Sequence, residues 1–274
     1  MLTLRNKDRV LSVEKPQVMG ILNITPDSFY SGSRYQQLDQ VIARAESMLL
    51  NGAALLDIGG QSTRPGSIRI EAEAEWSRIA SPIRAIMDRF PSVLLSVDTY
   101  HASVARRALE MGVFMINDIS AGEMDPDMIE TVASFFAPYV VMHMRGTPET
   151  MHENTQYEDV VEEVIFRLQQ KIDYCLKVGI ANVVVDPGLG FAKTAAQNFQ
   201  LIAHLEKFSV LKCPIMIGLS RKSFIYKTLG CSPEQALNGS TFLHAVGLQK
   251  GARILRVHDV KEAVESVRLY EQLS

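Results

Sequence analysis

The stretch NVVVD at residues 182–186 is a short apolar run that ends in a carboxylate, and the chain repeats this pattern. A run of β-branched residues is typical of a strand buried on both faces. Seven further apolar runs end on, or pass through, a polar residue: VMGILN (18–23), ALLDIGG (54–60), VLLSVD (93–98), VFMIND (113–118), YVVMH (139–143), PIMIGLS (214–220) and RILRVH (253–258). Longer stretches of helical period separate the runs. Eight buried strands that alternate with helices predict an α/β fold, a (β/α)8 barrel of the TIM type.

A short segment precedes the first of these runs. Residues 2–4 and 10–13 are largely apolar, and the polar Asn6-Lys7-Asp8 between them predicts a turn. We expect an N-terminal β-hairpin that plugs the bottom of the barrel. The chain has 274 residues, close to the usual size of one such barrel, and no Ser-, Gly- or Pro-rich linker divides it. We therefore predict a single domain over residues 1–274.

Apolar positions at helical spacing predict the helices between the strands. The clearest are expected at 72–89, 102–111, 157–178 and 195–208, with a longer segment at 233–251.

The composition is that of an ordinary globular protein, with 47% hydrophobic and 22% charged residues. The formal net charge of −3 argues against a nucleic-acid partner, which usually meets a basic stripe. The start MLTLRNKDRV has no apolar signal-peptide core, and no apolar run is long enough to span a membrane. Three scattered cysteines fit neither a disulfide framework nor a zinc site. We expect a cytoplasmic protein with no membrane partner.

Polar side chains stand at the predicted carboxyl ends of the strands or just after them. Because active sites of (β/α)8 barrels lie at this face, these side chains are candidates for chemistry. The set contains both signs of charge: Asn23, Asp57, Arg64, Asp98, Asn117, His143, Asp186, Lys222, Arg256 and His258. Carboxylates and amides can pair with ring N–H and amino groups, whereas arginine can bind phosphate oxygens with two parallel hydrogen bonds. The set predicts a substrate with a heterocyclic end and an anionic end.

Several of these residues also have a purely structural interpretation. Asp57 can cap the following helix or form an ion pair, and His143 can be a packing histidine. Arg221 and Lys222 can begin a solvated helix, although cations at a helix N-terminus oppose its dipole. A structural role is less easily assumed for Asp98 and Asp186, because both stand at the ends of predicted strands.

The loop DPGLGF at residues 186–191 follows one of the strands. Its two glycines permit positive φ or a close approach of the backbone, but no complete dinucleotide fingerprint follows them. We interpret Phe191 as an aromatic residue on an exposed loop that can wall an aromatic substrate. Met142 and Met144, on either side of His143, are interpreted as core residues.

The ordered set of short motifs resembles the dihydropteroate synthases of the pterin-binding enzyme family. The motifs are MGILNITPDSF (19–29), DIGGQSTRPG (57–66), SVDT (96–99), IND (116–118), HMRGTP (143–148), DPGLGFAKT (186–194), GLSRKSF (218–224) and RVHD (256–259). The resemblance implies an enzyme of folate biosynthesis that joins 7,8-dihydropterin-6-ylmethyl diphosphate to 4-aminobenzoate, and a target of sulfonamides. It also implies a homodimer through late helices, which fits the apolar segment 236–249.

The same resemblance implies roles for particular residues. The residues implied to hold the pterin are Asp98, Asn117, Asp186 and Lys222, with Arg256 over its face. Those implied for the diphosphate and Mg²⁺ are Asn23 (the metal ligand), Thr63, Arg64, Arg256 and His258. Those implied for 4-aminobenzoate are Phe29, Thr63, Pro65, Phe191, Lys222 and Ser223, and Val257 completes the substrate-binding set. The implied catalytic residues are Asp98, Asp186, Lys222 and Arg256.

The chain departs from the family pattern in its first loop, where Ser31 stands in place of the usual acid and Ser33 in place of a glycine. Gln61 also stands where Glu is common. Two alternatives accompany the synthase. A pterin-binding methyltransferase shares the pterin-holding acids but would lack the STRPG and SRKSF loops. A non-catalytic pterin-binding paralogue is supported only by the change at Ser31, and turnover would exclude it.

Overall fold

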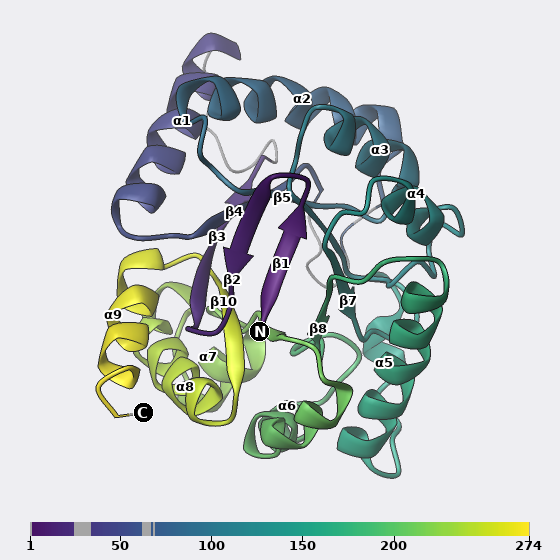
Figure 1. Ribbon diagram of the computed structural model, residues 1–274. Helices are drawn as coiled ribbons and strands as arrows, with labels where there is room; N and C mark the ends of the chain where they lie inside the picture. Colours follow the sequence, from purple (N-terminus) through teal and green to yellow (C-terminus); the bar gives the residue numbers. More distant parts are fainter. Residues whose placement is uncertain (1, 25–33, 62–66, 68, 274) are drawn as a thin grey trace.

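The computed structural model describes residues 2–24, 34–61, 67 and 69–273, with the backbone alone at 34–36. Eight parallel strands close into a barrel in the order β10-β3-β4-β5-β6-β7-β8-β9, and helices surround it (Figure 1). The predicted (β/α)8 barrel is confirmed. Its strands are β3 (Gln17–Asn23), β4 (Leu55–Gly59), β5 (Leu95–Asp98), β6 (Met115–Asp118), β7 (Tyr139–Met142), β8 (Val183–Asp186), β9 (Ile215–Ile217) and β10 (Ala252–Val257).

The strand register brings the predicted polar residues to one rim. Asn23 at the end of β3 pairs with Gly59 of β4, and Gly59 in turn pairs with Asp98 of β5. Asp98 also pairs with Asn117 of β6. Side chains spread over the sequence thus meet at the carboxyl ends of the strands.

The helices that surround the barrel are α1 (Arg34–Leu50), α2 (Ala72–Arg89), α3 (Ala102–Glu110), α4 (Met128–Ser134), α5 (Val160–Lys177), α6 (Ala195–Ala203), α7 (Ser223–Leu229), α8 (Leu237–Gln249) and α9 (Val260–Tyr270). Short 3₁₀ helices lie at η2 (Met151–Glu153), η3 (Leu205–Leu211) and η4 (Pro233–Gln235). Two expectations need correction. The helix predicted at 195–208 ends at Ala203 and continues as η3, and the segment predicted at 233–251 divides into η4 and α8.

The predicted N-terminal hairpin is confirmed as β1 (Thr3–Asn6) paired antiparallel with β2 (Arg9–Ser12). Leu4, Leu11 and Val13 pack in one buried cluster with residues from the starts of the barrel strands, such as Leu55 and Val184. The hairpin therefore closes the end of the barrel opposite the polar rim, and in Figure 1 it lies across the barrel opening.

Cys175 is buried, Cys213 and Cys231 are half-buried, and all three are free thiols. Within the described ranges, no helix is long and apolar enough to cross a membrane.

Candidate active site

Four side chains from four strands form one network at the rim, in which the two acids and the amide are buried and the arginine is half-buried. Arg256 of β10 donates from Nε to Asp57 Oδ2 of β4 over 2.6 Å and from Nη2 to Asp98 Oδ2 of β5 over 2.6 Å. Asn117 of β6 donates from Nδ2 to the same Asp57 oxygen over 3.0 Å. The other oxygen, Asp57 Oδ1, is buried and has no hydrogen-bond partner among the described residues. Asp57 thus forms an ion pair, one of the two structural interpretations that the sequence leaves open beside a functional one.

Burial shifts the pKa values of this network together with the neighbouring charges. It raises the pKa of Asp98 to about 7, while the Arg256 guanidinium opposes the rise and the Asp57 carboxylate adds to it. The two carboxylates conversely raise the pKa of Arg256 above its ordinary value, although burial acts against this. A permanent cation therefore stands between two acids, and one of these acids titrates near neutral pH.

Asp186 and Lys222 occupy the neighbouring part of the rim. Asp186 Oδ1 accepts a 2.7 Å bond from the Gly188 N–H, and Lys222 Nζ donates to the Leu189 carbonyl. A Cβ at Gly218 would lie 3.8 Å from Asp186 Oδ2 and 3.9 Å from Arg256 Cδ. The strand ends of β8, β9 and β10 therefore bring Asp186 close to the arginine network.

The charges on this pair are also shifted by burial. Burial raises the pKa of Asp186, against the effect of Lys222. Burial lowers the pKa of Lys222 to about 8, and the Asp186 carboxylate limits the fall. The site thus holds a carboxylate and an amine whose pKa values burial shifts in opposite directions, each toward the neutral form.

Phe191 differs from its expected setting. It lies not on an exposed loop but in a buried cluster with Met142 and Met144, and it is only 8% exposed. Its ring centroid lies 4.2 Å from Lys222 Nζ, a cation–π contact. The two methionines are core residues, as predicted. Phe191 can still wall a ligand through the ring that it turns to Lys222.

His143 is buried directly after β7 and its ring is hydrogen-bonded, which agrees with its structural interpretation as a packing histidine with its polar atoms satisfied. Its backbone N–H donates to the Asp186 carbonyl over 3.0 Å, and its ring nitrogen Nδ1 lies 3.1 Å from Lys193 Nζ. Sequence reasoning missed Lys193, although it lies inside the quoted motif DPGLGFAKT. A lysine near a polar loop suggests solvent exposure, and only the fold reveals that Lys193 is buried.

An ion pair and a hydrogen bond connect the residues that follow β9 with those that follow β10. Arg221 is not a solvated helix start, because it forms a bidentate pair with Asp259 at 2.8 and 2.9 Å. The backbone N–H of His258 donates to Ser220 Oγ over 3.3 Å. Ser223 is the first residue of α7. Val257 is fully buried in the main core.

Asn23 is half-buried at the end of β3. A Cβ at Gly59 would lie 3.6 Å from Asn23 Oδ1, so the glycine leaves room beside this oxygen. Phe29, Ser31, Thr63, Arg64 and Pro65 lie outside the described residues. Gln61 is described: its Nε2 donates to Tyr100 Oη, and its Oε1 accepts a 3.3 Å bond from the Ile70 N–H.

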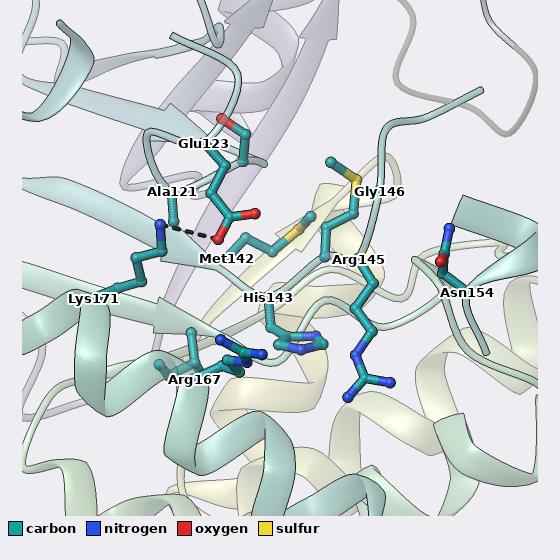
Figure 2. Close-up of a pocket in the computed structure, with 12 residues that line it drawn as sticks. Ala121, Glu123, Met142, His143, Arg145, Gly146, Asn154, Arg167 and Lys171 are labelled. Atoms are coloured by element: carbon teal, nitrogen blue, oxygen red, sulfur yellow. Dashed lines mark ion pairs between the residues drawn. The ribbon is translucent and has the colours of Figure 1, made fainter. Parts of the chain in front are cut away.

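A separate cavity of about 340 Å³ lies between the loops after β6 and β7 and the side of α5. Figure 2 shows Arg145 and Arg167 on either side of His143 there, and Lys171 paired with Glu123 at 3.1 Å. Arg145 pairs with Glu163. The cavity contains neither the acids nor the arginine of the network, and it shares His143 with the predicted rim set. Among the described residues, no group of three or more His, Cys, Asp or Glu side chains could hold a metal.

A closed parallel barrel with a buried, charged set at the carboxyl ends of its strands defines an enzyme of the (β/α)8 class. The family model described as "Pterin binding enzyme" matches residues 19–258. The dihydropteroate synthase of Escherichia coli is 40% identical over 263 residues, which cover 95% of this chain and 93% of that protein. The chain belongs to the pterin-binding enzyme family, among the dihydropteroate synthases.

Solved structures agree with this membership. Yersinia pestis dihydropteroate synthase in a sulfonamide drug complex superposes with a TM-score of 0.93 at 39% identity, covering 99% of both chains. The Xanthomonas albilineans enzyme in complex with 7,8-dihydropteroate superposes with a TM-score of 0.89 at 35% identity, covering 99% of this chain and 98% of that one.

Proposed function

We propose that this protein joins 7,8-dihydropterin-6-ylmethyl diphosphate to 4-aminobenzoate and releases 7,8-dihydropteroate and diphosphate. The observation that carries the proposal is the single network in which Arg256 binds both Asp57 and Asp98 and Asn117 binds Asp57. Such a set can read the N–H, amino and carbonyl edges of a pterin. All the relatives named above are synthases, which favours this activity over a methyltransferase.

The pterin would lie against Asp98, Asn117, Asp186 and Lys222, with Arg256 over its face. In the structure Arg256 forms ion pairs with both Asp98 and Asp57. Pterin N–H groups would therefore replace guanidinium N–H groups at Asp98. Asp98 would exchange hydrogen bonds from the guanidinium for hydrogen bonds from the ring. The buried carboxylate would therefore stay paired.

In the reaction, the amine nitrogen of 4-aminobenzoate forms a bond to the pterin methylene carbon. The C–O bond to diphosphate breaks, its electron pair leaves with the diphosphate, and the nitrogen loses a proton. Positive charge develops on the pterin as the bond breaks. The Asp98 and Asp186 carboxylates would stabilise this charge, and one well-placed group of this kind is worth about 10²–10³ in rate. The neutral amine needs positioning more than a strong base.

The diphosphate would be held by Thr63, Arg64, Arg256 and His258. The amide oxygen of Asn23, beside the space at Gly59, suits Mg²⁺, an ion that often relies on substrate phosphates for its other ligands. Mg²⁺ would neutralise charge on the leaving diphosphate. Only one protein oxygen is assigned to it, so we expect the ion to bind together with the diphosphate and not ahead of it.

The 4-aminobenzoate would lie between Phe29, Thr63, Pro65, Phe191, Lys222 and Ser223. The Phe191 ring and the Lys222 ammonium, 4.2 Å apart, offer an apolar wall and a cation for its carboxylate. We further propose that the protein is a cytoplasmic homodimer whose subunits meet through residues 236–249.

Turnover tests the proposal directly. Purified protein is mixed with Mg²⁺, the pterin diphosphate and 4-aminobenzoate, and products are separated by chromatography. We expect dihydropteroate and diphosphate in equal amounts, and none when any one component is omitted or when EDTA removes the metal. Binding of the pterin without any product would instead identify the non-catalytic paralogue.

A further inference from the structure

Lys193 is a buried lysine at the end of the loop that follows β8. Its ammonium nitrogen lies 3.0 Å from the Gly188 carbonyl, 2.9 Å from the Phe191 carbonyl and 3.1 Å from His143 Nδ1. A fourth contact, to the His143 carbonyl, is longer at 3.4 Å. The three short contacts match the three N–H groups of an ammonium, so the side chain is fully used in holding this loop.

The loop is pressed against the end of β7. Gly188 has φ of +69°, and a Cβ at this position would lie 1.9 Å from the His143 carbonyl oxygen. The next glycine, Gly190, donates its N–H to Asn198 Oδ1 over 2.6 Å. Lys193 and Asn198 are therefore two side-chain anchors of one tightly folded loop.

The charges that face Lys193 come from several elements. Burial lowers the pKa of Lys193, the Asp186 carboxylate raises it, and Lys222 and Arg145 lower it. His143, packed against it, has its pKa lowered to about 2 by burial and by Lys193, Arg145 and Arg167. A neutral His143 can accept at Nδ1 while its ring borders the cavity of Figure 2.

The anchored loop also contacts the candidate active site. The Leu189 carbonyl accepts a bond from Lys222 Nζ, and the Phe191 ring lies 4.2 Å from that nitrogen. We propose that Lys193 is a positioning residue, which fixes the loop 187–192 and thereby sets the place of Lys222 and Phe191 at the substrates. The inference rests on the proposed synthase function.

The variant Lys193→Met keeps an unbranched side chain one atom shorter than lysine and removes its three donors. We expect its affinity for 7,8-dihydropteroate, measured by calorimetry, to fall at least about 10-fold and kcat to fall at least as much, because misplacement in a site of this kind is costly. The control is Asn6→Leu, which removes two buried bonds to the Val113 and Phe114 carbonyls at the far end of the barrel. That variant should lower Tm but leave affinity and kcat within about twofold of wild type.

A double-mutant cycle separates positioning from general stability. If Lys193 acts through Lys222, Lys193→Met should change affinity less than about twofold once Lys222→Met is present. The inference would be overturned if the effects of the two substitutions on affinity multiply in the double variant. It would also be overturned by a Lys193→Met protein that binds and turns over like wild type. If Lys193→Met does not fold, Asn198→Leu frees the same loop at Gly190, and the same cycle with Lys222→Met decides. An inactive wild-type protein would overturn the proposed function instead.

Discussion

Arg256 Nη2 lies 2.6 Å from Asp98 Oδ2, although the two residues are 158 positions apart in the chain. The pair spans the rim from β10 to β5, so it exists only because the barrel closes. The carboxylate that would face the pterin is thus paired with a guanidinium, and its pKa still rises to about 7 because it is buried.

A bell-shaped pH profile should follow from the two shifted groups. Asp98 must be ionised to accept from the pterin, so kcat/KM should rise as pH increases through about 7. Lys222 must be protonated to donate, so kcat/KM should fall as pH increases through about 8. In Lys222→Arg the guanidinium stays charged, and the alkaline limb should move above pH 10. Steady-state kinetics from pH 5.5 to 10 test this, and an unmoved alkaline limb would remove Lys222 from the scheme.

Glu75 on α2 should make stability depend on pH. Burial raises its pKa to about 8, and its Oε2 accepts a 2.8 Å bond from Thr99 Oγ1. Because the folded pKa lies above the unfolded value, stability is lost as pH rises from about 4.5 to 8. Glu75→Gln should therefore stabilise the protein by about 1–3 kcal/mol at pH 8 and little at pH 5. The control is thermal unfolding of Glu110→Gln, a substitution at an exposed residue. A gain in stability of Glu75→Gln that is equal at pH 5 and pH 8 would contradict the assignment.

The proposed dimer makes a prediction about α8. Phe242 on this helix is 66% exposed in the single chain, within the segment 236–249. Phe242→Glu should convert the dimer to a monomer, as measured by light scattering after gel filtration. Phe166→Glu on α5, where the phenyl ring is 61% exposed, should leave the mass unchanged. A monomeric wild type, or equal behaviour of the two variants, would rule out this interface.

Strand ends were the predictable part of this protein. Apolar runs that end at Asp98 or Asp186, or pass through Asn117, identify both the strands and the face of the barrel, because strand direction fixes where the last side chains lie. The resemblance of the motifs then assigned the residues to substrates. Contacts made through the backbone were not predictable, and Lys193 is the example: two of its three short partners are carbonyls of a loop whose path only the fold defines.

The segment after α6 differs from the prediction because its buried residues follow a three-residue period. Leu205, Phe208 and Leu211 are buried at intervals of three residues, the period of a 3₁₀ helix. In the sequence this spacing also fits one face of a longer α-helix, which led to the prediction at 195–208. Phe191 was misplaced because its burial depends on Met142 and Met144 of a distant strand and loop.

The turnover of Asp98→Asn tests the account most directly. The substitution keeps the shape of the side chain but removes the charge that would face the pterin cation and adds an N–H donor. With wild type and variant compared at saturating Mg²⁺, pterin diphosphate and 4-aminobenzoate, the account predicts a fall in kcat of at least about 10²-fold with Tm retained. A folded Asp98→Asn protein that forms dihydropteroate at close to the wild-type rate would contradict it.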